Sequence, residues 1–112
     1  MVRKIKKYQR LLAQFLLEEL PENQSEELSY QVITDMKNNH FQLVEMGWYE
    51  NKFIYRIVLH LSIKPNAKIW LWVNNTDILV AEELVKLGVL ASDIVLGFHS
   101  AEVRRYTGFA VA

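Results

Sequence analysis

One stretch of alternating residues constrains the fold of this chain more than any other feature. Between Phe53 and Ile63, every second residue is a large apolar one. A period of two is typical of a β-strand with one buried face, because successive side chains point to opposite sides of a sheet. The alternation therefore predicts a central strand whose core side carries Phe53, Tyr55, Ile57, Leu59, Leu61 and Ile63.

Three other segments predict neighbouring strands, over residues 29–36, 40–49 and 68–73. Glu50 and Asn51 fit a two-residue hairpin loop between the second strand and the central one. That loop places Glu45 opposite Arg56, where opposite charges favour the pairing. The same register sets three apolar pairs, namely Trp48 with Phe53, Met46 with Tyr55, and Val44 with Ile57. The fourth strand is expected to add Ile69, Leu71 and Val73 to the core side.

Helical spacing of apolar residues predicts a long N-terminal helix over residues 2–20. Its core stripe consists of Ile5, Tyr8, Leu12, Phe15 and Leu16. A second helix is expected over residues 77–87, capped by side chains of residues 74–76 and ended by Gly88, which accepts a left-handed backbone. A short strand over 94–98 and a helical turn over 100–105, capped by Ser100, follow.

These elements predict one α+β domain spanning residues 1–112. Its sheet is expected to be an antiparallel β-meander of four to five strands. A long N-terminal helix, a second helix after strand four and a short C-terminal helix flank this sheet.

The composition excludes several classes of protein. The chain has no cysteine, which removes disulfides, zinc-thiolate centres and thiol nucleophiles and fits a reducing cytoplasm. Its 13 basic residues balance 13 acidic ones, whereas a domain that holds nucleic acid is usually basic. No apolar run approaches the roughly 20 residues of a membrane-spanning helix, and the first residues lack the apolar core of an export signal. We expect a cytoplasmic protein that contacts nucleic acid weakly or indirectly.

The sequence contains no recognisable catalytic or metal-binding pattern. It lacks a phosphate-binding loop, a dinucleotide fingerprint and a nucleophile elbow. The three histidines, His40, His60 and His99, stand far apart in the sequence. Glu82 and Glu83 are neighbours on a helix and point in different directions. We therefore expect no catalytic residue, metal, cofactor or small-molecule substrate.

The N-terminal helix carries a basic face opposite its apolar stripe. This face includes Arg3, Lys6, Lys7 and Arg10. The solvated side of an amphipathic helix accounts for such residues, and a contact with DNA phosphates is the other interpretation. These four residues are the candidate nucleic-acid contacts.

A second apolar surface is expected on the side of the sheet away from the core. It carries Phe41, Leu43, Val58, His60, Trp70 and Trp72. Burial of one large side chain stabilises a protein by about 2–3 kcal/mol, so two tryptophans left in water would be costly. Either the C-terminal segment or another protein chain covers this face. Because tryptophan is enriched at the centres of interfaces, we favour an interface with a second copy or a partner.

Several segments along nearly the whole chain resemble one known family. The most specific are Asp93-Ile94-Val95-Leu96-Gly97-Phe98-His99, Arg105-Tyr106-Thr107 and Phe109-Ala110-Val111. Residues 42–48, 68–70 and 82–89 support them in the same order. Together they resemble the XisI family, the fdxN-element excision controlling factors of filamentous nitrogen-fixing bacteria.

This resemblance implies a role rather than a reaction. XisI proteins are accessory factors for the programmed removal of a DNA element by a site-specific recombinase. They accompany a second small protein, XisH, which resembles nucleases in fold. We therefore expect a non-enzymatic regulatory factor, a homodimer, that acts through protein–protein contacts with an XisH-like partner or the recombinase. The alternatives are a DNA-binding module that uses the basic helix and a non-catalytic subunit of a nuclease complex.

In the leading interpretation, the C-terminal segment contacts the partner. Gly97 allows a tight backbone turn, and Phe98 anchors it. His99 and Arg105 offer polar contacts, and Trp70 and Trp72 complete the predicted partner-binding set.

Overall fold

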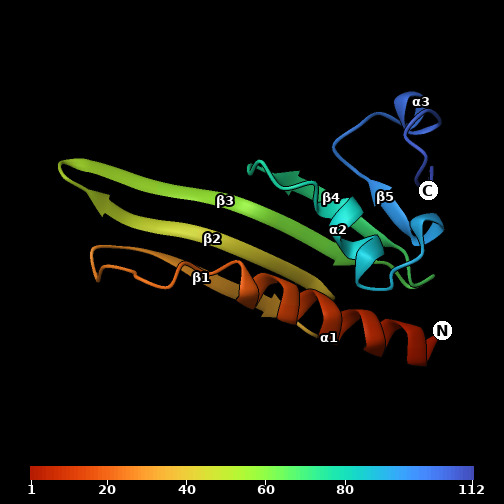
Figure 1. The fold of residues 1–112 in the computed structure, drawn as a ribbon, viewed down its shortest axis with the longest axis horizontal. Helices are drawn as coiled ribbons and strands as arrows, with labels where there is room; N and C mark the ends of the chain where they lie inside the picture. The colour runs from red at the N-terminus through yellow and green to blue at the C-terminus, as the bar shows by residue number, and fades with distance from the viewer.

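The computed structural model describes all residues, 1–112, and its elements follow the predicted order. The first half consists of α1 (Val2–Glu18), β1 (Leu28–Asp35), β2 (His40–Tyr49) and β3 (Lys52–Ile63). The second half consists of β4 (Ile69–Asn74), α2 (Val80–Lys86), the 3₁₀ turn η1 (Ala91–Asp93), β5 (Ile94–Leu96) and α3 (Ala101–Arg104). The predicted α+β class, with its long N-terminal and short C-terminal helices, is confirmed (Figure 1).

The five strands form one sheet in the order β1-β2-β3-β4-β5. The first four are antiparallel neighbours, so the predicted meander is confirmed. β5 runs parallel to β4, because the chain crosses over through α2 and η1 before it returns to the sheet. The C-terminal tail continues beside β5, where the amide of Ala110 donates a hydrogen bond to the carbonyl of Ile94 at 2.8 Å.

The predicted hairpin register is confirmed. Trp48 pairs with Phe53 across the loop at Glu50 and Asn51, and Glu45 pairs with Arg56. The Nε atom of Arg56 donates to Oε1 of Glu45 at 2.7 Å. The ion pair and the apolar pairs therefore act together to fix one register.

The hydrophobic core lies between the sheet and the two larger helices. α1 contributes Tyr8, Leu12, Phe15 and Leu16, as the helical spacing predicts. α2 contributes Val80, Ala81 and Leu84, and the strands contribute Phe41, Leu43, Val58, Leu59, Leu61, Ile63, Ile69, Leu71 and Ile94. Both helices therefore lie against the same face of the sheet.

The alternation in β3 is interrupted by a β-bulge, which corrects one prediction. Val44 pairs with Ile57, but Leu43 pairs with Leu59, so Val58 has no partner of its own. Val58 and Leu59 both turn toward the helices, and the strand changes face at this point. The predicted core side is therefore wrong for Phe53, Tyr55 and Ile57, which lie on the opposite face; Phe53 and Tyr55 are 58% and 66% exposed. The predicted position of Phe41, Leu43 and Val58 on the far face is also wrong, because all three are buried in the core.

Two smaller predictions near β4 also need correction. His60 pairs with Val73 while Leu61 pairs with Leu71, so Trp72 is an extra residue and Val73 leaves the core side. The side chains of residues 74–76 hold the turn before α2 rather than cap the helix. The N-cap position of α2 is Leu79, which has no side-chain cap.

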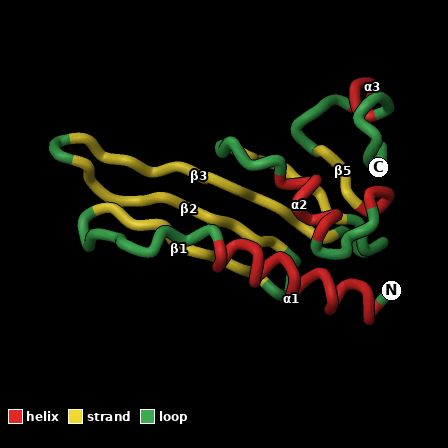
Figure 2. Tube along the Cα trace, in the orientation of Figure 1, coloured by secondary structure: helices red, strands yellow, loops and turns green.

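The β2–β3 hairpin extends beyond both larger helices, as Figure 1 shows at the left of the view. The segment that joins α1 to β1 runs beside this extension (Figure 2). The molecule is elongated, with extents of 43 × 30 × 24 Å. None of its helices combines the length and apolar character that crossing a membrane requires.

Candidate functional site

The side of the sheet away from α1 and α2 carries the candidate functional surface, which we call the open sheet face. Cross-strand pairing and the two irregularities assign side chains to this face. From β2 and β3 it receives His40, Gln42, Val44, Met46, Trp48, Phe53, Tyr55, Ile57, His60 and Ser62; from β4 it receives Trp70, Trp72 and Val73. One end of the face is aromatic, and the other combines polar and aromatic groups.

Trp70 and Trp72 stack on each other at the polar end, with ring centroids 5.0 Å apart and planes tilted by 24°. The indole Nε1 of Trp72 donates a hydrogen bond to Oγ of Ser62 at 2.8 Å. The guanidinium of Arg104 lies 4.9 Å from the ring centroid of Trp70, and the ammonium of Lys64 lies 5.2 Å from the same centroid. The C-terminal segment therefore covers part of the tryptophan pair, which is one of the two arrangements expected from the sequence.

Gly97 is the point where the C-terminal segment touches this pair. A Cβ atom at Gly97 would lie 2.9 Å from Cε3 of Trp72 and 3.1 Å from Cε3 of Trp70. The predicted turn exists, since the amide of His99 donates to the carbonyl of Leu96 at 3.1 Å. Its requirement for glycine differs from the predicted one, because Gly97 has no positive φ. The residue is small because two indole rings press on it.

His40 and His60 meet on the same face, although they stand far apart in the sequence. Nδ1 of His40 and Nε2 of His60 are 3.0 Å apart, a distance at which one ring nitrogen donates to the other. Burial and then the nearby His40 lower the pKa of His60. Both histidines line a hollow of about 500 Å³, whose other walls include Asn38, Lys64 and Trp72. The alternation in β3 does not predict this pair, because the bulge at Val58 moves His60 opposite Gln42.

The other predicted partner-binding residues lie in the exposed C-terminal segment. Phe98 is 48% exposed and packs its ring against His99, with centroids 4.6 Å apart. Arg105 lies over the ring of Tyr106 at 5.6 Å and beside Glu102. The structure therefore joins Gly97 to Trp70 and Trp72 and joins Phe98 to His99, but Arg105 belongs to a separate cluster.

Arg104 is a further residue of this surface that was not among the predicted partner-binding residues. Its Nε donates to the carbonyl of His99 at 3.0 Å, and its Nη1 donates to the carbonyl of Val111 at 2.7 Å. It thereby ties α3, the turn after β5 and the tail together above Trp70. The adjacent Arg105 looks equivalent in sequence, so only the fold distinguishes the two.

The predicted basic stripe on α1 is exposed. Arg3, Lys6, Lys7 and Arg10 recur at three- and four-residue intervals, which places them on one side of the helix. None of the four takes part in an ion pair. Lys4 differs from these four residues, because its ammonium pairs with the carboxylate of Asp93, near the other end of the sequence, at 2.7 Å.

Asp93 is a buried carboxylate that anchors the family-like C-terminal segment. The phenol of Tyr8 donates to its Oδ2 at 2.7 Å, beside the ammonium of Lys4. Burial acts to raise the pKa of Asp93, but hydrogen bonds from Lys4 and Tyr8 outweigh it and hold this pKa below its usual range. The first residue of the segment that resembles the family is thus part of the interior.

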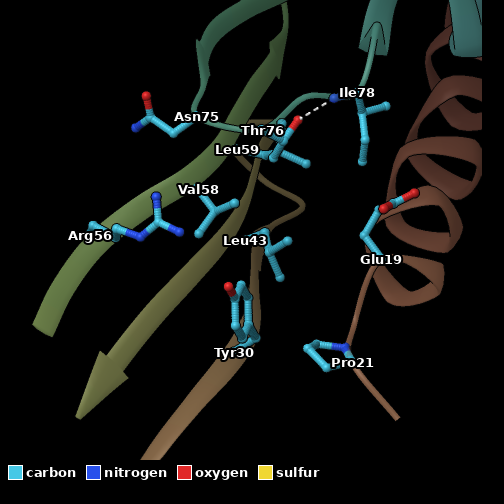
Figure 3. Close-up of a pocket in the computed structure, with 10 residues that line it drawn as sticks. All are labelled: Glu19, Pro21, Tyr30, Leu43, Arg56, Val58, Leu59, Asn75, Thr76 and Ile78. Carbon is cyan, nitrogen blue, oxygen red and sulfur yellow. Dashed lines mark hydrogen bonds between the residues drawn. The ribbon is translucent and has the colours of Figure 1, made fainter. Parts of the chain in front are cut away.

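A second hollow of about 290 Å³ lies on the helix side of the sheet (Figure 3). Strand residues Tyr30, Leu43, Arg56 and Val58 line one side of it, and Glu19 and Pro21 line the other. Arg56 is its only cation, and Glu45 already neutralises that charge. No group of three or more histidine and carboxylate side chains is placed to hold a metal ion anywhere in the chain.

Comparison with known proteins identifies the family of this chain. The family described as XisI protein matches the sequence over residues 2–111. The chain belongs to the XisI family. No curated protein matches the sequence.

Two crystal structures of XisI relatives from Anabaena variabilis share the fold. One is described as an XisI-like protein; it is 40% identical, has a TM-score of 0.89, and the match covers 96% of this chain and 99% of that one. The other is described as the fdxN element excision controlling factor XisI; it is 27% identical, has a TM-score of 0.79, and the match covers 97% of this chain and 99% of that one. The predicted XisI resemblance is therefore confirmed.

Proposed function

We propose that this XisI protein is a non-catalytic regulatory factor that controls the excision of a DNA element through contacts with other proteins. The observation that carries the proposal is its fold, which it shares over nearly its whole length with a relative described as an excision controlling factor. An XisH-like protein is the proposed partner, and the site-specific recombinase is the second.

The proposed contact surface is the exposed part of the C-terminal segment. Phe98, His99, Arg105 and Tyr106 offer two aromatic rings, an imidazole and a guanidinium. Aromatic residues and arginine are the side chains most enriched at energetic centres of interfaces. Trp70 and Trp72 lie underneath and hold the backbone at Gly97, so they support the surface and are partly covered themselves.

Binding between the purified chain and the XisH-like protein of the same organism tests this proposal. Titration calorimetry should give a defined affinity that falls about tenfold or more in His99→Ala and in Arg105→Ala. Leu17→Ala is the control, because Leu17 is 49% exposed and lies on α1, outside the proposed surface. Equal affinity in all four proteins would dismiss the C-terminal surface, and no binding by the wild-type chain would dismiss the XisH-like partner.

One observation favours a second candidate, direct contact with DNA. The four exposed cations Arg3, Lys6, Lys7 and Arg10 form a stripe along α1 without acidic partners. Each phosphate contact steepens the dependence of affinity on salt concentration. A labelled duplex titrated at two salt concentrations should show a slope that flattens in Lys6→Ala/Arg10→Ala if this stripe binds DNA. Gln14→Ala, an exposed substitution on the same helix, should leave the slope unchanged.

A further inference from the structure

The hairpin end of the open sheet face exposes an aromatic cluster, which we call the aromatic tip: Trp48, Phe53 and Tyr55. Trp48 and Phe53 touch, with ring centroids 5.3 Å apart, yet the three side chains remain 53%, 58% and 66% exposed. A free aromatic side chain presents on the order of 150–250 Å², so the tip exposes roughly 300–400 Å². A single patch of that size is already as large as the largest apolar patch of a typical monomer.

The face next to this tip is uncharged. Between Trp48 and Gln42, the side chains of β2 and their partners on β1 and β3 are apolar or neutral on the open side. The helix side of the same hairpin carries the Glu45–Arg56 ion pair instead. Depletion of charge together with aromatic residues and methionine is the composition of an interface centre.

The opposite end of the same face is concave. There the hollow of about 500 Å³ lies between His40, His60 and Trp72. Trp48 and His40 are each four residues from Val44 along β2, in opposite directions. At about 3.4 Å per residue, the tip and the hollow lie roughly 14 Å on either side of Val44.

From this arrangement we infer that a second copy of the chain docks on the open sheet face. The two copies are related by a two-fold axis near Val44, and the aromatic tip of each copy fills the hollow of the other. In a two-fold contact, the same surface of both copies meets. If residue i of one copy contacts residue j of the other, then residue j of the first copy contacts residue i of the second. A face with a projection at one end and a hollow at the other meets that condition when the axis passes through their midpoint. The tip is uncharged, so it places no like charge against Lys64, which lines the hollow.

The flat outline of the face supplies more than half of the area that a typical stable interface buries on each partner. Three strands about 4.8 Å apart and ten residues at about 3.4 Å outline roughly 500 Å² in projection, before side-chain relief adds to it. Stable interfaces use about 800 Å² on each partner. Two sheets packed face to face would also bury the half-buried Met46 and Ile57 in a shared layer, as in aligned sheet packing.

The oligomeric state of the purified full chain tests the inference first. Light scattering after size-exclusion chromatography should give a dimer at about 100 µM, a concentration at which any micromolar dimer is formed. Tyr55→Asp should raise the dissociation constant about tenfold or more, because it places a charge inside the contact. The control Leu79→Asp adds the same charge at an equally exposed site on the helix side and should leave the dimer intact. Circular dichroism should show that both variants fold.

Engineered cysteines test the geometry. The chain has no cysteine of its own, so only the engineered positions can be cross-linked. Ile57→Cys lies beside the proposed axis, where facing sheets are about 10 Å apart, so a short bismaleimide should cross-link it to its own copy. Phe53→Cys lies at the tip, far from its own copy, and should not.

Three results would overturn the inference. One is a folded wild-type chain that remains monomeric at that concentration. The second is efficient cross-linking through Phe53→Cys but not through Ile57→Cys. The third is a monomer whose binding to a different protein is lost in Tyr55→Asp, since that would assign the face to the other protein. The first two results measure self-association alone, so they do not depend on the regulatory function.

Discussion

The phenol of Tyr8 donates a 2.7 Å hydrogen bond to the carboxylate of Asp93, 85 residues further along the chain. Lys4 pairs with the same oxygen at 2.7 Å. These contacts fasten α1 to the residue that precedes β5, and β5 carries the turn that touches the tryptophan pair. The N-terminal helix therefore fixes the position of the C-terminal segment proposed to meet a partner.

Tyr8→Phe removes the hydrogen-bond donor and leaves the ring. Hydrogen bonds to charged groups contribute about 1.5–3 kcal/mol, so we expect the free energy of unfolding in urea to fall by about that amount. Tyr106→Phe is the control, because Tyr106 is 80% exposed, and it should change stability by less than about 0.5 kcal/mol. Equal stability of Tyr8→Phe and the wild-type chain would show that the contact does not hold the two ends together.

The same contact predicts that the phenol of Tyr8 loses its proton only at unusually high pH. Burial and the hydrogen bond to Asp93 raise the pKa of Tyr8 from 10.0 to about 12. Because this pKa is raised by folding, its contribution to stability is complete below about pH 10 and is lost as the pH rises toward 12. Tyrosinate absorbance should therefore show a phase near pH 12 that Tyr8→Phe abolishes. Absence of that phase from the wild-type titration would contradict the burial of the phenol.

Gly97→Ala should strain the tryptophan pair. The added Cβ would lie 2.9 Å from a ring atom of Trp72, and overpacking of this kind costs about 1–3 kcal/mol. Near-ultraviolet circular dichroism should change, because the two stacked indoles must separate. Gly108→Ala is the matched control: its Cβ meets open space but its φ is +83°, so it should lower stability without altering the indole signal. An unchanged indole signal in Gly97→Ala would dismiss the close contact.

His60 predicts a loss of stability on mild acidification. Folding lowers the pKa of His60, so the unfolded chain binds a proton more readily. Stability should therefore fall as the pH drops below about 6.5 toward the lower pKa in the fold. The groups that face His60 are His40, Gln42 and, across the same hollow, Lys64 and Trp72, with no carboxylate among them. His60→Gln should flatten this part of the stability profile in thermal denaturation between pH 5 and pH 7; an unchanged slope would contradict it.

Local patterns predicted most of the fold. The spacing of Tyr8, Leu12, Phe15 and Leu16 fixed the buried face of α1, and the two-residue loop fixed the pairing of Glu45 with Arg56. Both predictions depend on contacts within a few residues or across one tight turn. Such contacts are determined by the sequence close to them.

The face reversal in β3 could not be predicted in this way. Val58 is apolar, like its neighbours, and no glycine or proline marks the bulge. A bulge here depends on tertiary packing, because Val58 and Leu59 both gain burial against the helices. This single residue decides that Phe53 and Tyr55 are exposed and that His60 meets His40. The candidate surface was therefore predicted only at Trp70 and Trp72 of β4 and at His60 of β3.

The sequence singled out the C-terminal segment, but it did not predict the contacts of the individual residues in it. Asp93 is an anchor for Tyr8 and Lys4, and Gly97 is small because of two indole rings. Both reasons involve residues far away in the sequence, so the segment alone does not reveal them. Within residues 93–99, Phe98 and His99 are the exposed members.

The central claim is that this XisI protein controls excision of a DNA element through its C-terminal surface. Genome sequencing of the organism, with and without the gene, measures the fraction of reads that span an excision junction. We predict that this fraction changes when the gene is deleted, that the wild-type gene and Leu17→Ala restore it, and that His99→Ala does not. The same junction fraction with and without the gene would contradict the account.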